Sequence, residues 1–166
     1  MKPIYIFDLD GTLALIEHRL HYIKRPSLKC LDVSWKADWR GFFAAVSDDK
    51  PNEPVIRLLR TLRSKSEIWI WSGRSDECRA QTIDWLYKNG CITRWQSLNP
   101  FSCPEQFRMR KAGDYRDDVV VKSEWLAEIE PPEYKRLTAV FDDRDRVVQM
   151  WRDAGIMCCQ VASGDF

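Results

Sequence analysis

The sequence has almost no net charge, few histidines and no long apolar run at its start, and each shortage excludes a class of protein. Its 26 lysines and arginines nearly cancel its 25 aspartates and glutamates, so no field of one sign draws the chain to nucleic acid or to an anionic membrane. The apolar stretch that ends at Asp8 is too short for the apolar region of a signal peptide or for a spanning helix. We therefore expect a cytoplasmic protein without an export signal, in which any contact with a polyanion is local.

The cysteines form no recognisable metal-binding pattern. No two of them have Cys-x-x-Cys spacing, and the two histidines, His18 and His21, lie far from most of them. We interpret the cysteines as reduced, mostly structural thiols of a cytosolic protein. They are Cys30, Cys78, Cys91, Cys103, Cys158 and Cys159.

The chain of 166 residues is the size of one ordinary domain, and its short apolar runs alternate with segments of helical spacing. This alternation predicts an α/β fold with a Rossmann-like parallel sheet of about five strands flanked by helices. The expected strands are residues 2–8, 67–71, 106–109, 137–142 and 156–161, and the expected helices are residues 53–64, 75–89, 117–128 and 144–154, with Gly90 and Gly155 ending two of them.

The second expected strand lacks polar alternation from Ile68 to Trp71, as a central strand covered by helices on both faces should. We expect Trp69 and Trp71 to be buried on opposite faces of that strand.

Residues 15–52 interrupt the strand and helix rhythm, because they form a connection longer than such units normally contain. We expect a small, cap-like helical insertion in which Ser34 caps a helix, and from which the chain returns to the sheet at Pro51 and Pro54. The helix would either pack on the sheet domain or form a lid wall near a substrate. Its aromatic and apolar face would comprise Trp35, Trp39, Phe42, Phe43 and Val46.

The strongest chemical motif is the run from Asp8 to Thr12, Asp-Leu-Asp-Gly-Thr, at the carboxyl end of the first expected strand. Open α/β sheets bind their ligands at this edge, and Gly11 lets the backbone turn sharply. Two aspartates with a glycine also form ordinary turns. The motif alone therefore leaves both interpretations open.

Three further groups of polar residues follow the later strands in order. Ser72, Gly73 and Arg74 offer a hydroxyl, a glycine and a cation to phosphate oxygens. Asp118 and Lys122 lie four residues apart on an expected helix, which by itself is also typical of a surface ion pair. Asp142 and Asp143 close the fourth strand. Together with Asp8 and Asp10 these groups predict one site.

The set resembles the haloacid dehalogenase superfamily of phosphotransferases, and this resemblance implies a role for each residue. Asp8 would be the nucleophile that forms an aspartyl-phosphate, and Asp10 the general acid and base. The Asp8 carboxylate, the Asp10 backbone carbonyl and Asp142 would hold Mg²⁺, with Asp143 assisting through a water. Residues holding the substrate phosphate would be Lys122, Ser72, Gly73 and Thr12.

A closer resemblance, to the 3′-phosphatase domain of phage polynucleotide kinase/phosphatase, lies in residues 113–122, 141–144, 147–152 and 160–166. It implies that Arg19 and Arg74 bind the substrate phosphate. It also places Asp118 at the substrate-binding site, where it would orient Arg74 or Lys122. The implied substrates are 3′-phosphorylated DNA or RNA ends in nucleic-acid repair, or small nucleotides.

The departures from that family restrict the prediction. The chain has no Gly-x-x-x-x-Gly-Lys-Ser/Thr loop, so any kinase or ligase activity would lie on a separate chain. Two alternatives to a polynucleotide phosphatase are a phosphatase of mononucleotides or other small esters, and a silent binding module. The intact set of Asp8, Asp10, Lys122 and Asp142 speaks against a binding module. Four cations near the site form either a solvated rim or a footprint for terminal nucleotides: Arg108, Arg110, Lys111 and Arg116.

Overall fold

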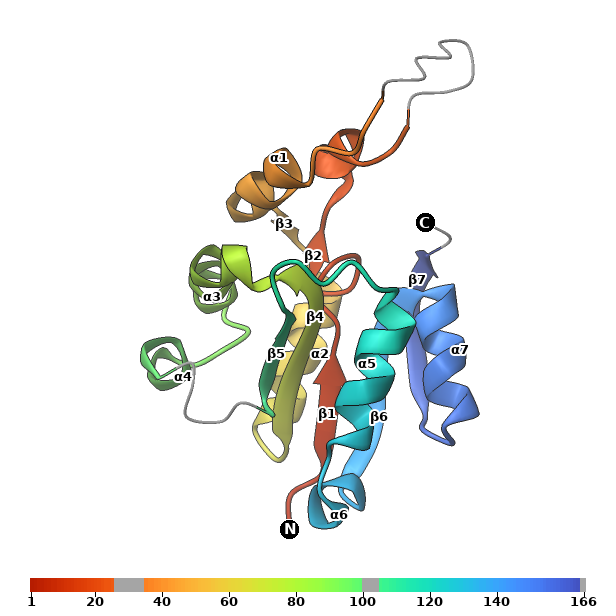
Figure 1. Cartoon of the computed structure of the whole chain (residues 1–166). Helices are drawn as coiled ribbons and strands as arrows, with labels where there is room; N and C mark the ends of the chain where they lie inside the picture. The colour runs from red at the N-terminus through yellow and green to blue at the C-terminus, as the bar shows by residue number, and fades with distance from the viewer. Residues whose placement is uncertain (26–34, 100–104, 165–166) are drawn as a thin grey trace.

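The computed structural model describes residues 1–25, 35–99 and 105–164. It confirms the α/β class: five parallel strands form one sheet in the order β5-β4-β1-β6-β7, with helices on both faces (Figure 1). The first strand lies at the centre and the later strands are added on both sides. The strands are β1 (Ile4–Phe7), β4 (Glu67–Ser75), β5 (Phe107–Arg110), β6 (Leu137–Arg144) and β7 (Cys158–Gly164).

Four helices cover the sheet near the positions that the sequence predicts. One face packs against α2 (Glu53–Arg63) and α3 (Arg79–Lys88), and the other against α5 (Asp118–Ala127) and α7 (Asp145–Asp153). Gly90 and Gly155 follow α3 and α7 as expected. The expected helix at residues 75–89 starts later, because β4 continues to Ser75 and a 3-10 turn, η3 (Asp76–Cys78), precedes α3. Two short helices were not predicted: α4 (Arg94–Leu98) and α6 (Pro131–Tyr134).

The tryptophans of β4 correct one prediction. Trp69 and Trp71 are both buried, but on the same face of the sheet, where their rings stack with centroids 6.1 Å apart. Side chains alternate along a strand, so residues two apart point the same way. Trp71 also packs against Trp125 of α5 and Trp151 of α7.

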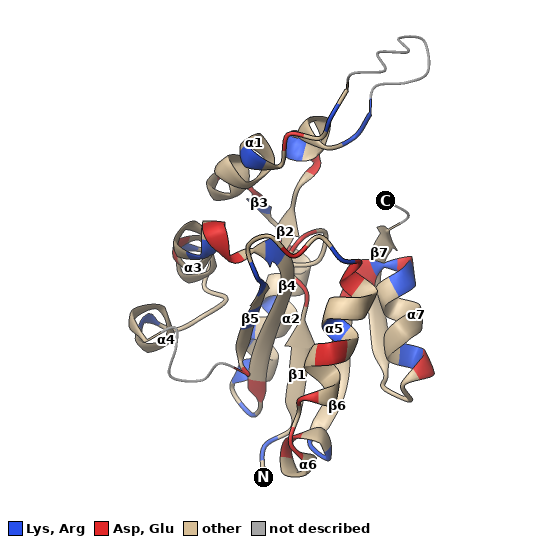
Figure 2. Ribbon diagram, in the orientation of Figure 1, with Lys and Arg blue, Asp and Glu red and all other residues tan. Residues whose placement is uncertain are grey.

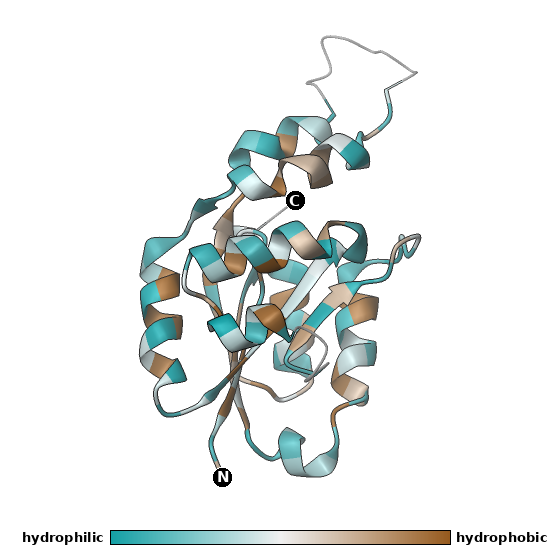
Figure 3. Cartoon of the chain, turned by 90° about the vertical axis from the view of Figure 1, so that its left-hand side faces the viewer, coloured by the Kyte–Doolittle hydropathy of each residue, from teal (hydrophilic) through white to brown (hydrophobic). Residues whose placement is uncertain are grey.

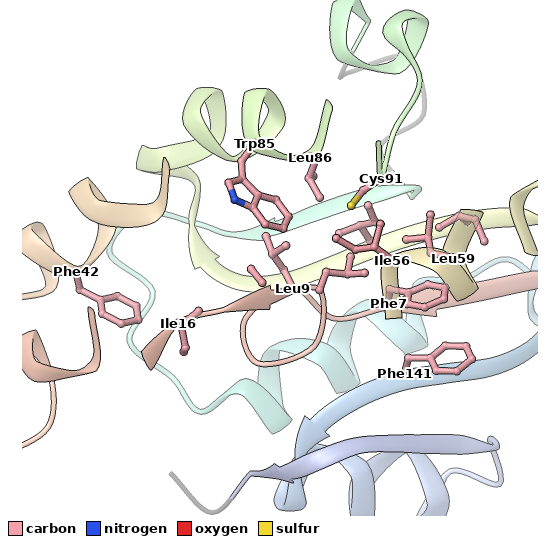
Figure 4. Close-up of a cluster of buried hydrophobic side chains, with 14 residues drawn as sticks. Phe7, Leu9, Ile16, Phe42, Ile56, Leu59, Trp85, Leu86, Cys91 and Phe141 are labelled. Carbon is pink, nitrogen blue, oxygen red and sulfur yellow. The ribbon is translucent and has the colours of Figure 1, made fainter. Parts of the chain in front are cut away.

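The opposite face carries the larger core (Figure 4). Phe7 of β1 stacks on Phe141 of β6 with ring centroids 4.4 Å apart, and α2 and α3 cover this pair. The cluster continues through Leu9 to Ile16 and Phe42 in the insertion. Apolar packing therefore joins the insertion to the sheet domain.

The insertion lies above the carboxyl end of the sheet (Figures 1 and 3). It is framed by an antiparallel pair of short strands, β2 (Ala14–Leu15) and β3 (Lys50–Pro51). Between them lie η1 (Glu17–Tyr22), α1 (Trp39–Ala44) and η2 (Ala45–Asp48). Asp38 caps α1 by accepting a hydrogen bond from the Gly41 N–H, whereas the predicted cap, Ser34, lies outside the described residues.

None of the helices in the described ranges is both long and apolar enough to cross a membrane.

Candidate active site

The predicted residues meet at the carboxyl edge of the sheet. Asp8 follows the central strand β1, while Asp142 and Asp143 end the neighbouring strand β6. On the other side of β1, the ladder between β4 and β5 is irregular between Ser72 and Ser75. Such an irregularity redirects side chains, and Arg74, which lies within it, turns toward the end of β1. The sheet order therefore brings together residues from three distant parts of the sequence.

Lys122 of α5 connects two of the carboxylates. Its Nζ donates to Asp8 Oδ1 at 2.6 Å and to Asp142 Oδ2 at 2.8 Å, and all three side chains are buried. Burial raises the pKa of Asp8 well above its usual value; Lys122 opposes this effect, and Asp142 and Asp143 add to it. The pKa of Lys122 is raised, because the neighbouring carboxylates outweigh the effect of burial. The ammonium group therefore stays charged and partly offsets the repulsion between the carboxylates.

Three buried carboxylates have the composition of a site for a hard cation. Oxygens of Asp8, Asp142 and Asp143 all lie within 4.8 Å of one another. Burial and the proximity of Asp142 raise the pKa of Asp143 to about 6. A divalent cation would relieve the repulsion among these oxygens, and Mg²⁺ prefers oxygen ligands. The residues present fit that ion. The Asp10 side chain lies outside this group of oxygens. This agrees with the expectation that Asp10 would bind the metal through its backbone carbonyl.

The Asp143 carboxylate is packed tightly against the turn after Asp8. A Cβ atom on Gly11 would lie 2.0 Å from Asp143 Oδ2, so glycine is required there. Thr12 Oγ1 donates to Asp143 Oδ1 at 3.3 Å, and Thr12 is fully buried. Thr12 therefore holds Asp143 in place, instead of facing a substrate.

The second half of the site is an ion-pair network around Asp10. Asp10 Oδ1 accepts hydrogen bonds from Arg19 Nη2 at 2.6 Å and from Arg74 Nε at 2.7 Å. Burial favours protonation of Asp10, but Arg74 and then Arg19 outweigh it and lower the pKa of this carboxyl. In the free protein Asp10 is thus an ionised carboxylate, whereas a general acid must carry a proton.

Asp49 completes the network and was not predicted. Its carboxylate accepts from Arg19 Nε at 2.6 Å, from Arg19 Nη2 at 2.9 Å and from Arg74, and its side chain has no exposed surface. The Asp49 carbonyl also accepts from Trp85 Nε1 of α3 at 2.7 Å. In the sequence Asp49 follows Asp48 just before β3, and such a pair resembles an ordinary polar turn.

Asp118 has partners other than the expected ones. Its two carboxylate oxygens pair with Arg110 of β5 and with Arg144 at the end of β6, not with Arg74. A Cβ atom on Gly73 would lie 2.5 Å from Asp118 Oδ1, so Asp118 also packs against the backbone of β4. Asp118 therefore links the ends of β4, β5 and β6. Its charge also raises the pKa of the nearby Lys122, but less than the charges of Asp142 and Asp8 do.

The four cations near the site are mostly engaged with the protein. Arg108 lies over the Trp71 ring and pairs with Glu128. Arg110 donates to the Gly73 carbonyl at 2.9 Å. Arg116 pairs with Asp114 and Glu124, and Lys111 lies 3.5 Å from Asp76. These contacts favour a structural role for Arg108 and Arg110 over the predicted footprint.

A cavity of about 870 Å³ opens over the site. Its floor is polar and holds Asp8 and Asp10, and its upper wall comes from the insertion and is mostly apolar, with Arg40 as a charged residue beside the aromatic rings. The floor comprises Asp8, Asp10, Arg74, Lys122, Asp142 and Asp143, and the wall comprises Ile16, Ile23, Trp39, Phe42, Phe43 and Ala44.

The family model for the polynucleotide kinase PNKP phosphatase domain matches residues 36–166. The chain belongs to this family. The matched residues include the strand ends that carry Arg74, Asp142 and Asp143, as well as Lys122 of α5.

Relatives of this PNKP phosphatase domain agree with the assignment. A protein described as a bifunctional polynucleotide kinase/RNA ligase of Autographa californica nuclear polyhedrosis virus is 28% identical over 151 residues, covering 90% of this chain and 18% of the viral protein. A chain in the Pnkp1/Rnl/Hen1 RNA repair complex is 28% identical, with a TM-score of 0.71, covering 99% of this chain and 44% of that chain. The chain thus spans less than half the length of these relatives.

The haloacid dehalogenase resemblance is confirmed as well. The family match carries it, and the fold is shared with the haloacid dehalogenase-like hydrolase SP0104 from Streptococcus pneumoniae, at 16% identity and a TM-score of 0.58 over 96% of this chain and 84% of that chain.

Three residues that the two resemblances placed on the substrate phosphate lie behind the cavity surface. Ser72 is fully buried, and its Oγ accepts from the Arg74 N–H at 3.2 Å. Arg19 is fully buried behind Asp10, and Thr12 lies behind Asp143. Within the described chain, the expected phosphate-binding residues that line the cavity are Gly73, Arg74 and Lys122, with Asp118 beside them.

Proposed function

We propose that this domain is a Mg²⁺-dependent phosphatase that removes 3′-phosphate groups from polynucleotide ends through an aspartyl-phosphate on Asp8. The observation that carries the proposal is the buried contact of Lys122 with Asp8 and Asp142, beside Asp10 and at the base of one cavity. A site that only binds phosphate does not need a carboxylate at this place, because a carboxylate repels phosphate. A nucleophile does fit there.

The proposed reaction proceeds in two displacements. An oxygen of Asp8 attacks phosphorus while the bond to the ester oxygen breaks, and Asp10 gives its proton to that leaving oxygen. Water then attacks phosphorus, Asp10 takes a proton from it, and the bond to Asp8 breaks to release inorganic phosphate. Lys122 offsets negative charge as the anionic nucleophile approaches the anionic substrate.

The contact between Arg74 and Asp10 explains how substrate would prepare the acid. Arg74 makes the largest contribution to the lowered pKa of Asp10 and also lines the cavity. A substrate phosphate that takes hydrogen bonds from Arg74 would weaken its hold on Asp10, so the pKa of Asp10 would rise and the carboxyl could gain its proton. Arg19, behind Asp10, would keep the side chain in position.

Mg²⁺ would be held by Asp8, Asp142, Asp143 and the Asp10 carbonyl, and when bound it would neutralise charge on the phosphate oxygens. The buried carboxylates with raised pKa values support this assignment.

The polynucleotide substrate is proposed from the family and from relatives whose names refer to a polynucleotide kinase/RNA ligase and to an RNA repair complex. Kinase and ligase activities would come from other domains or chains. Residues 15–52 would act as a cap over the site.

The test compares a 3′-phosphorylated oligonucleotide with 3′- and 5′-mononucleotides in the presence of Mg²⁺. We expect a higher kcat/KM for the oligonucleotide, no turnover by Asp8→Asn, and a reversible loss of activity on chelation. A preference for the mononucleotides would instead identify a small-ester phosphatase. Full activity in Asp8→Asn would exclude the aspartyl-phosphate.

A further inference from the structure

The cavity over the site has two chemically distinct halves. The floor holds the carboxylates, Arg74 and Lys122, whereas the wall contributed by the insertion carries aromatic rings. A phosphate group bound by Arg74 and Lys122 would fill only the floor, so a cavity of about 870 Å³ leaves room above it for the rest of the substrate. The aromatic wall therefore lies where the leaving group of the substrate would be.

The aromatic wall is a packed structure with one open ring. Trp39 stacks on Phe43 with ring centroids 5.9 Å apart and meets Phe42 edge-on at 5.7 Å. Phe42 is buried and lies under the Arg19 guanidinium, 4.1 Å from ring centroid to Cζ. Trp39 keeps 48% of its surface exposed. The inner rings thus hold a large aromatic face at the cavity on a support that also contacts the Asp10 network.

The charges around the cavity do not form a continuous positive surface that could bind a polyanion. Seven basic and eight acidic side chains line it, and Figure 2 shows both signs interleaved on the loop between β5 and α5 and at the start of α5. Arg110 and Arg116 are paired with carboxylates. Backbone phosphates beyond the reacting one therefore find few free cations, and affinity for a strand must come mainly from another source.

We propose that Trp39 stacks on the base of the terminal nucleotide whose 3′-phosphate reacts. This inference rests on the proposed phosphatase function and names how the same site recognises its substrate. Aromatic rings bind any base through its face, so the contact tolerates different sequences and suits an enzyme that acts on ends. A neutral ring in a cavity lined by nearly equal numbers of basic and acidic side chains selects a nucleotide over a bare phosphate ester.

The experiment uses two 3′-phosphorylated oligonucleotides with the same number of phosphates, one complete and one lacking only the base of its terminal nucleotide. Stacking of a single base predicts that the wild type prefers the complete strand in kcat/KM by about 5- to 100-fold. Trp39→Ala should remove most of that preference, and Trp39→Phe should keep part of it. Trp95→Ala is the matched control, because Trp95 is also exposed on a helix, α4, but does not line this cavity.

Binding to the two strands in an Asp8→Asn background should show the same preference in Kd. Equal turnover of both strands by the wild type, or an unchanged preference in Trp39→Ala, overturns the stacking contact and leaves the polynucleotide function standing. Turnover of mononucleotides with none of either strand overturns the polynucleotide function, and the inference falls with it.

Discussion

The buried ion-pair network offers the sharpest test of how the insertion supports the site. Asp49 and Asp10 together balance the charges of Arg19 and Arg74, and Asp49 and both arginines have no exposed side-chain surface. Replacing Asp49 with Ala leaves two buried guanidinium groups with a single carboxylate. Breaking a buried pair in this way costs about 3 to 5 kcal/mol of the free energy of unfolding.

Asp49→Asn keeps the shape and one acceptor oxygen but removes the charge, so we expect a smaller loss of about 2 kcal/mol. Because domains have unfolding free energies of about 5 to 15 kcal/mol, the Asn variant should remain folded. Its arginines would hold Asp10 in a different arrangement, and we expect kcat/KM on a small ester to fall by about tenfold or more.

The assay is urea unfolding followed by tryptophan fluorescence, together with initial rates on the same preparations. Asp48→Asn is the control, because Asp48 is adjacent in sequence but exposed. If Asp49→Asn unfolds at the same urea concentration as Asp48→Asn and retains wild-type rates, the network neither stabilises the fold nor positions Asp10.

Two further predictions concern the metal site and the core. The pKa of Asp143 is raised from 3.8 to about 6 by burial and by Asp142, so the folded state binds this proton more tightly than the unfolded state. In metal-free protein its ionisation should reduce stability as pH rises from about 4 to 6, by up to about 3 kcal/mol relative to Asp143→Asn. Unfolding midpoints of the wild type and Asp143→Asn, measured across that pH range, test the prediction. A difference between the two proteins that does not change with pH would contradict it. Mg²⁺ should stabilise the wild type most above that pH range, where Asp143 is ionised. Trp71→Ala should cost about 3 to 5 kcal/mol, whereas the exposed Trp95→Ala should unfold close to wild type; similar losses in both would refute the central packing of Trp71.

Local sequence patterns predicted the elements well but misjudged some faces. Apolar runs placed the five strands, because the central strands β1, β4 and β6 are largely buried and the edge strands β5 and β7 each keep an apolar stretch. The prediction that Trp69 and Trp71 lie on opposite faces was wrong, because residues two apart on a strand point to the same face, and this spacing is visible in the sequence.

The order of the chemical groups can be recognised in the sequence alone: the Asp8 to Thr12 turn, the strand end at Ser72 to Arg74, Lys122, and the pair Asp142 and Asp143. A parallel sheet with right-handed connections brings successive strand ends to one edge, so recognising the strands was enough to predict that these groups meet.

The pairing of the charges, in contrast, depends on the tertiary structure. Arg74 meets Asp49 across 25 residues and Asp10 across 64, and Arg110 binds Asp118 instead of standing free for a substrate. A charged side chain on a turn looks the same in sequence whether it ends in water or in a buried ion pair. The choice depends on desolvation, which exists only once the insertion and the strand ends have closed over the same few carboxylates.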